Sequence, residues 1–148
     1  MRFDKFVFAQ FCDDIRFEVG NKTTLAGLYS GEIAFPAFPA LLPKLGCATT
    51  IVWPSNDPPL KIEAKLMIGD EVGMSERLPD GALSQFIEMA KKKENSEPLE
   101  RIAVNLNFIV SPVNFAAETT IKMLVYIDGE EVEAGRIKAV IAPAPPSV

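Results

Sequence analysis

Apolar residues recur with a period of two over residues 119–141, close to the C-terminal end of the chain. The residues of one parity before the turn are Ile121, Met123, Val125 and Ile127. This is the period of a half-buried β-strand. Asp128 and Gly129 follow at once, and this pair favours a tight hairpin because both turn positions need positive φ. The pattern predicts an antiparallel hairpin whose apolar face needs a second layer to cover it.

Shorter segments with alternating, β-branched or aromatic residues predict further strands. They cover residues 4–12, 15–19, 23–29, 44–53, 60–68 and 101–110, with a short edge segment at 31–35. Gly20 and Asn21 are turn residues, so we expect the segments on either side of them to form a second hairpin. An acidic pair, Asp13 and Asp14, interrupts the first two segments, which are either two strands or one bent strand. The polar residues 69–80 indicate a connector.

Three other segments depart from the alternation. Leu83, Phe86, Ile87 and Ala90 recur at helical spacing, so residues 82–93 predict one amphipathic helix. Prolines punctuate residues 36–43, which we expect along the rim or surface because proline cannot donate to a strand ladder. Residues 143–148 are rich in proline and predict a flexible tail.

The order of these segments decides the fold class. Strands do not alternate with helices, which argues against a parallel α/β sheet. We predict a mostly β protein: a two-layer antiparallel β-sandwich, immunoglobulin-like or jelly-roll-like, with one short helix at 82–93. A closed barrel is the alternative. The length of 148 residues suits one domain, residues 1–142, followed by the tail at 143–148.

The absence of histidine is the most informative count in the composition. It excludes Ser-His-Asp and Cys-His nucleophile systems and zinc sites that use histidine, and two cysteines are too few for a four-thiolate site. Catalysis would have to use carboxylate, lysine, tyrosine or cysteine chemistry. We expect no cofactor and no bound metal.

Charge and hydropathy limit the partners and the cellular location that the sequence predicts. The net charge of −5 gives no footing for nucleic acid or for an anionic membrane. No signal-peptide pattern opens the chain, and no apolar stretch approaches a membrane span. We therefore expect a cytoplasmic protein in which Cys12 and Cys47 are reduced and buried.

The densest polar group consists of Asp13, Asp14, Arg16 and Glu18. The last three share a parity, so they should project from one face as a ladder of opposite charges on the surface. A second interpretation is a cation or ligand site built from Asp13, Asp14 and Glu18, because Ca²⁺ favours clustered oxygen ligands. Paired-carboxylate catalysis is the third. The acidic turn at 128–133 lacks EF-hand spacing and indicates a soluble turn.

A second candidate surface lies between the prolines of residues 36–43. Phe38, Leu41 and Leu42 either plug the end of the sandwich or meet a partner, since exposed apolar clusters tend to mark contacts. Trp53, beside Pro54, is either a core residue or an exposed recognition aromatic. We take these four as candidate partner-binding residues.

The N-terminal third carries a pattern that resembles an uncharacterised bacterial and prophage family of small proteins. The matching residues are Cys12, Asp13, Asp14, Arg16 and Glu18, then Gly20 and Lys22, then Gly27 and Tyr29, with Pro112 and residues 126–130 towards the end. The resemblance implies a compact β-rich domain without a named catalytic residue. Occurrence in phage-derived regions would imply a virion part or an inhibitor of host defence.

The leading functional hypothesis is a non-enzymatic interaction or structural module that contacts another protein or a second copy of itself, as a homo-oligomer. A ligand- or cation-binding domain, similar to a carbohydrate module, is the second. A carboxylate-based hydrolase is the third, which would need two carboxylates facing each other across a cleft.

Overall fold

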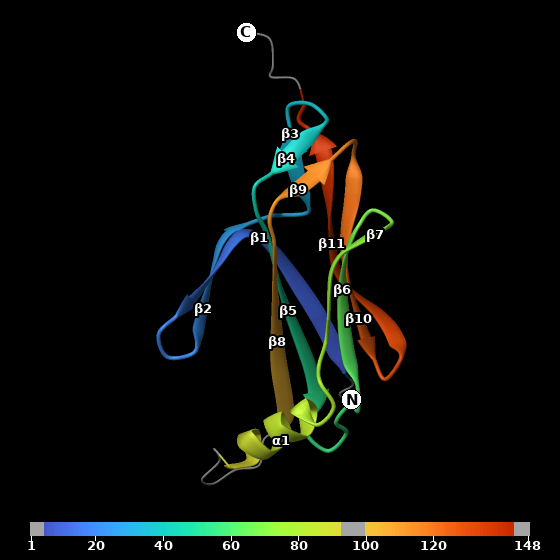
Figure 1. Cartoon of the computed structure of the whole chain (residues 1–148). Helices are drawn as coiled ribbons and strands as arrows, with labels where there is room; N and C mark the ends of the chain where they lie inside the picture. The colour runs from blue at the N-terminus through green and yellow to red at the C-terminus, as the bar shows by residue number, and fades with distance from the viewer. Residues whose placement is uncertain (1–4, 93–99, 144–148) are drawn as a thin grey trace.

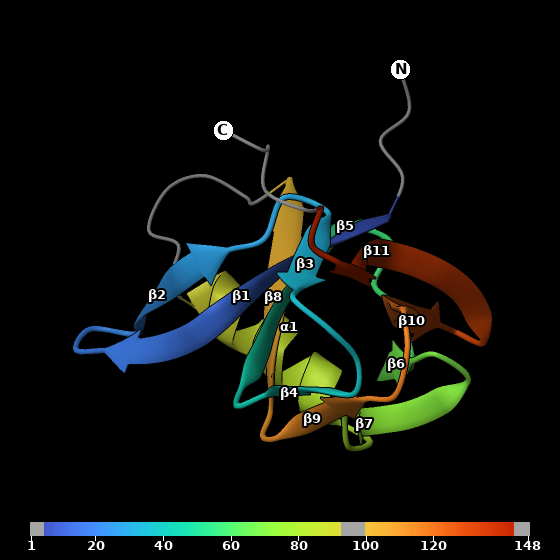
Figure 2. The same cartoon turned by 90° about the horizontal axis from the view of Figure 1, so that it is seen from above.

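Two stacked β-sheets form the body of the protein (Figures 1 and 2). The structure, a computed structural model, describes residues 5–92 and 100–143. The first sheet has the order β2-β1-β5-β8, with β1 (Phe6–Glu18), β2 (Lys22–Leu28), β5 (Leu45–Pro54) and β8 (Arg101–Val110). The second has the order β3-β11-β10-β6-β7, with β3 (Glu32–Phe35), β6 (Ile62–Ile68), β7 (Glu71–Arg77), β10 (Thr119–Ile127) and β11 (Glu130–Ile141).

Two smaller elements close the ends of this sandwich. A small sheet of β4 (Ala40–Leu42) and β9 (Val113–Phe115) lies at one end, and the helix α1 (Ala82–Lys92) lies at the other (Figure 1). Leu83 of α1 is buried and Ile87 packs against the core, as the helical spacing predicts. Within the described residues, no helix has the length and apolar character needed to cross a membrane.

The predicted mostly β sandwich with one short helix is confirmed, and the sheets do not close into a barrel. The strand pairs are antiparallel with one exception, because β3 runs parallel to β11. The expectation of antiparallel pairing alone is wrong there. After β2 the chain leaves the first sheet and enters the second at its edge, where Ile33 and Phe35 turn inward and become buried.

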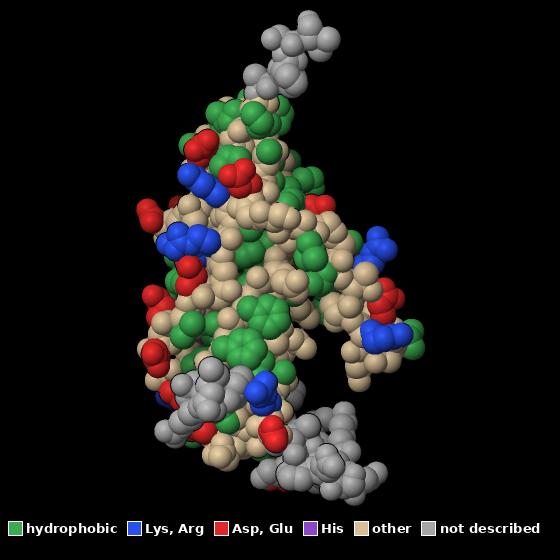
Figure 3. All heavy atoms as spheres, turned by 180° about the vertical axis from the view of Figure 1, so that it is seen from behind, with side chains coloured by type: hydrophobic (Ala, Val, Ile, Leu, Met, Phe, Trp, Pro, Cys, Tyr) green, Lys and Arg blue, Asp and Glu red, His purple; other side chains and the backbone are tan. Residues whose placement is uncertain are grey.

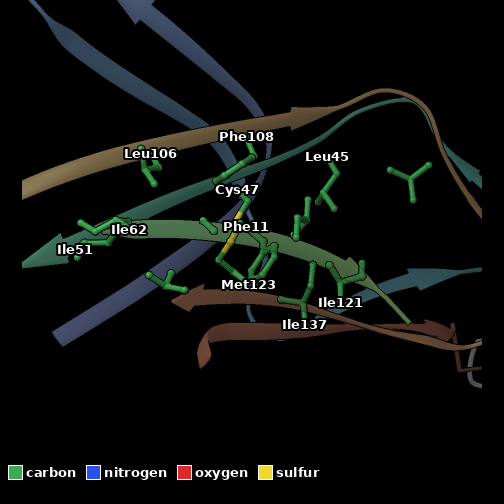
Figure 4. Close-up of a cluster of buried hydrophobic side chains, with 14 of the residues drawn as sticks. Phe11, Leu45, Cys47, Ile51, Ile62, Leu106, Phe108, Ile121, Met123 and Ile137 are labelled. Atoms are coloured by element: carbon green, nitrogen blue, oxygen red, sulfur yellow. The ribbon is translucent and has the colours of Figure 1, made fainter. Parts of the chain in front are cut away.

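The core lies between the two sheets and follows the predicted period of two. Figure 4 shows Leu106, Phe108, Leu45, Cys47 and Ile51 of the first sheet facing Ile62, Ile121, Met123 and Ile137 of the second. Ile121, Met123, Val125 and Ile127 of β10 are all buried. The 119–141 hairpin forms as predicted, with positive φ at Asp128 (50°) and Gly129 (84°).

Glycine permits a close approach between the layers at one side. A Cβ on Gly135 of β11 would lie 3.1 Å from the carbonyl oxygen of Ala9 in β1. The register of β10 and β11 shifts by one residue opposite this point, between Met123 and Leu124. Such a bulge bends a strand. At this point Gly135 of β11 lies against Ala9 of β1.

Several segment boundaries differ from the sequence expectations. Residues 69–80 are more than a connector, because β7 pairs with β6 there. All seven residues of β7 are exposed, so this edge strand has no buried parity to detect. Asp13 and Asp14 do not interrupt β1, which is continuous from Phe6 to Glu18. The end of the predicted helix at residue 93, the side chains of Phe86 and Ala90, and the tail from residue 144 lie outside what the structure describes.

Candidate functional site

A β-hairpin arm extends from the body of the protein. We define the arm as residues 13–28, the part of β1 and β2 that extends beyond the pairing of β1 with β5 (Figure 1). From Phe6 to Cys12, β1 pairs with β5; from Cys12 to Glu18 it pairs with β2. Gly20 and Asn21 turn the chain at the tip, with φ of 84° and 57°. Because β1 continues after its pairing with β5 ends, the arm has a partner strand on one side only.

The arm has one apolar and one charged face. The register pairs Ile15 with Leu25 and Phe17 with Thr23, and paired residues share a face. The opposite face carries Asp14, Arg16, Glu18 and Lys22. Nε of Arg16 lies 3.6 Å from Oδ2 of Asp14, in agreement with the predicted surface ladder. The sequence therefore codes an amphipathic hairpin.

Most of the apolar face of the arm is open to solvent. Ile15, at the base, is buried near Gly46 of β5. Phe17 is 68% exposed, and Val19, beside the turn, is 93% exposed. The view from behind in Figure 3 shows the arm standing clear of the body. Nothing within the described residues covers the outer half of this face.

Polar contacts hold the base of the arm on its apolar side. The hydroxyl of Tyr29 donates a hydrogen bond to Oδ1 of Asp13. Gly27, with φ of +71°, lies against the same carboxylate, and a Cβ there would be 2.2 Å from Oδ2 of Asp13. Burial, followed by the hydrogen bond to Asp13, raises the pKa of Tyr29 above its ordinary value. Gly27 is thus required both by its backbone conformation and by space.

Asp14 anchors the other side of the base. Nζ of Lys44, just before β5, donates to Oδ1 of Asp14 at 3.1 Å. This hydrogen bond is the largest cause of the lowered pKa of Asp14. The thiol of Cys12 donates to the backbone carbonyl of Asp14 at 3.4 Å. The bond to Lys44 ties the arm to the segment before β5, whereas the bonds from Cys12 and Tyr29 fix β1 against itself and against the residue that follows β2.

The predicted cation or ligand site is not assembled by its three carboxylates. Asp13 and Asp14 are adjacent in a strand and project to opposite faces. Glu18 is four residues beyond Asp14, about 13 Å along the strand. Among residues 5–92 and 100–143, no group of three or more acidic or cysteine side chains is arranged to hold a metal ion. The structure gives Asp13 and Asp14 a positioning role in the arm.

The predicted partner-binding residues differ in how far they are buried. Phe38 packs edge-on against Phe35, with ring centroids 5.8 Å apart, and Leu42 is buried. Trp53 is 0% exposed, which corrects its assignment as a recognition aromatic: it faces inward from β5. Leu41 alone of the four predicted residues is strongly exposed, at 56%. Leu42 and the half-buried Phe38 close the end of the sandwich, and Leu41 is the one of the three that lies mostly open to solvent.

An open cleft lies at the opposite end, between the start of β1 and the turn from β10 to β11. Its volume is about 480 Å³, and its lining includes Lys5, Val7 and Ile127. Nζ of Lys5 lies 3.7 Å from a carboxylate oxygen of Asp57 and 4.0 Å from one of Asp128. The cleft therefore presents an ion-paired rim.

Asp128 has a structural role that the sequence did not indicate. Its Oδ1 accepts hydrogen bonds from the backbone amides of Leu60 and Lys61, both at 2.8 Å. The acidic turn consequently ties down the loop before β6. The open apolar face of the arm was also missed, because alternation predicts a strand face without saying what covers it.

Comparison with known proteins finds one matching family model. It covers residues 7–140 and is described as a family of unknown function (DUF6941). No curated protein and no solved structure matches the chain significantly. The match agrees with the expected resemblance to an uncharacterised family and assigns no activity.

Proposed function

The chain belongs to the DUF6941 family of unknown function, and from its geometry we propose that it is a non-enzymatic interaction module that contacts another polypeptide through the β1–β2 arm. The observation that carries the proposal is the open apolar face of the arm, where Phe17 is 68% exposed.

The energetics of this face favour a contact. Burying a phenylalanine side chain stabilises a structure by about 1.5–3 kcal/mol relative to leaving it exposed. A two-stranded hairpin is marginally stable by itself, so the outer arm gains order from any surface that covers Phe17 and Val19. Exposed apolar clusters on soluble proteins commonly mark such contacts.

The base of the arm supports the same proposal. Asp13 bonds to Tyr29 and Asp14 to Lys44, one on each face of β1, at the point where the pairing of β1 with β5 ends. An arm held in one direction loses less conformational freedom on binding than a loose loop. The same carboxylates are engaged within the protein, which weighs against the cation-binding and hydrolase alternatives.

The proposal extends to the biological setting in which the protein acts. The resemblance of the Asp13, Asp14 and Gly27 pattern to bacterial and prophage proteins suggests a virion component or an inhibitor of host defence. The reduced state expected for Cys12 and Cys47 fits a cytoplasmic site of action.

Photo-crosslinking in cells that carry the gene tests the proposal. Phe17 is replaced by benzoylphenylalanine in the full-length chain, and Phe8, an exposed phenylalanine on the first sheet (42% exposed), is replaced in the control. We expect a discrete protein adduct from position 17 and none of the same mass from position 8. Absence of an adduct at position 17, with the protein folded and present at its normal level, would refute the role of the arm.

A further inference from the structure

The outer edge of β2 is the starting point for asking which polypeptide the arm contacts. We infer that the arm binds a second copy of this chain, with the two β2 strands paired antiparallel about a two-fold axis at Thr24. The first sheets of the two copies then form one continuous eight-stranded sheet. This inference rests on the proposed function and names the partner of the same surface.

Among residues 5–92 and 100–143, no strand pairs with the outer edge of β2. β2 is the outermost strand of the first sheet, and its residues are exposed or half-buried. Edge strands are usually guarded by charges, proline or bulges. The opposite edge of the second sheet follows that rule, because β7 carries Glu71, Glu76 and Arg77. β2 has Lys22 as its one charged residue and no proline.

The backbone defines where the two strands meet. Asn21 before the strand and Gly27 near its end have φ of 57° and 71°, so regular extended backbone runs from Lys22 to Ala26. The midpoint of this stretch is Thr24. Pairing about Thr24 sets Thr23 opposite Leu25 and Lys22 opposite Ala26 of the second copy. Thr24 then faces its own equivalent, and threonine pairs are favourable across antiparallel strands.

The charged faces of two arms are complementary in this register. One row across the four strands reads Glu18, Lys22, then Ala26 and Asp14 of the second copy. Lys22 therefore has Glu18 as its acidic neighbour on one side and the small Ala26 of the second copy on the other, with Asp14 of the second copy one strand farther. The two Arg16 side chains share the central row at opposite ends, about 14 Å apart at the usual strand spacing. That separation exceeds the screening length of about 8 Å at physiological salt.

The apolar faces also join. On this face one row across the four strands reads Phe17, Thr23, then Leu25 and Ile15 of the second copy. The two-fold axis produces a second row with the same residues in the opposite order. Two narrow apolar faces become one layer that spans four strands, which exceeds the three strands that a sheet with one apolar face needs for independent stability. The apolar face and the free edge thus favour the same partner.

A single cysteine at the axis tests the register. In the Thr24→Cys variant the two Cα atoms lie about 4.5–5.5 Å apart across the axis, which is within disulfide range. Arg16→Cys is the matched control, since its two copies lie in the same row but about 14 Å apart. Native Cys12 and Cys47 are buried. Under mild oxidation we expect a covalent dimer from Thr24→Cys and none from Arg16→Cys or wild type.

Light scattering gives an independent readout. We expect wild type at twice the chain mass of 16.2 kDa. Phe17→Asp should weaken dimerisation roughly tenfold or more, equivalent to 1.4 kcal/mol, and Phe8→Asp should leave it unchanged. Circular dichroism confirms that both variants fold.

Two outcomes separate this inference from the proposed function. A monomeric wild type without a Thr24→Cys dimer overturns self-pairing. If position 17 still gives an adduct with a different protein in cells, the arm remains an interaction element with another partner. If it gives no adduct either, both proposals are wrong.

Discussion

Gly27→Ala tests the account of how the arm is fastened. The new Cβ would lie 2.2 Å from Oδ2 of Asp13 and 2.8 Å from its Cγ, so the carboxylate must move. Moving it breaks the hydrogen bond from Tyr29. The substitution therefore adds a steric displacement to the ordinary strain of a side chain at positive φ.

The loss of folding stability expected for Gly27→Ala has two contributions. Alanine in the left-handed region costs about 1–2 kcal/mol, offset in part by the lower entropy of the unfolded chain, for a net of about 1 kcal/mol. A hydrogen bond to a charged group contributes about 1.5–3 kcal/mol, which we reduce to about 1 kcal/mol because this pair is partly exposed. The sum is about 2 kcal/mol, or roughly 4–8 °C in Tm for a chain of this size.

Gly69→Ala is the matched control. Gly69 also has positive φ (+62°), and a Cβ there would meet only the methyl group of Thr119, at 3.4 Å. It should cost about 1 kcal/mol, the strain alone. Urea unfolding of both variants gives the comparison.

A double-mutant cycle with Tyr29→Phe completes the test. In wild type, Tyr29→Phe should cost about 1 kcal/mol; in the Gly27→Ala background it should cost almost nothing, because Asp13 has already moved. If Gly27→Ala were no worse than Gly69→Ala, or if the two costs simply added, the proposed contact between Gly27, Asp13 and Tyr29 would be refuted.

Three further predictions concern other parts of the molecule. Asp128→Gly keeps the positive φ of the turn but removes the acceptor of two amide hydrogen bonds. The amide hydrogens of Leu60 and Lys61 should then exchange about fivefold faster, which corresponds to a loss of about 1 kcal/mol. Unchanged exchange rates would contradict this role of Asp128. The raised pKa of Tyr29 means that its neutral form stabilises the folded protein. This stabilisation is complete below pH 10 and is lost as the pH rises above it. Above pH 10 the free energy of unfolding of wild type should therefore fall more steeply than that of Tyr29→Phe. Burial raises the pKa of the Cys47 thiol to about 12, so maleimide at pH 8 should leave Cys47 unlabelled in the native protein and label it after unfolding, as read by mass spectrometry.

Sequence patterns captured most of the sandwich because strand formation is a local property. The alternation at 101–110 places Ile102, Val104, Leu106 and Phe108 inward, and all four are buried. Local pattern failed for β7, whose seven exposed residues have no buried parity. Its backbone pairs with β6, and backbone pairing leaves no requirement on side chains.

The candidate site was only partly predictable. The polar group of Asp13, Asp14 and Glu18 stood out in the sequence, where a surface ladder of charges was the first interpretation and a cation or ligand site the second. The structure shows Asp13 bonded to Tyr29 and Asp14 to Lys44. Lys44 is 30 residues from Asp14, and no local periodicity reports a partner at that distance. Trp53 was ambiguous for the same reason, since inward and outward strand positions look alike until the opposite sheet is placed.

The sequence by itself determined the elements: the period of two set the strands and their apolar faces, Asp128 and Gly129 set a turn, and the absence of histidine limited the chemistry. Tertiary structure alone decided which strands are neighbours and where each pairing ends. The pairing of β1 with β5 ends at Cys12, but β1 itself continues to Glu18. The part of β1 beyond Cys12, together with β2, forms the arm. The physical reason is that alternation arises within one strand, whereas the end of a pairing depends on the register of a segment distant in sequence.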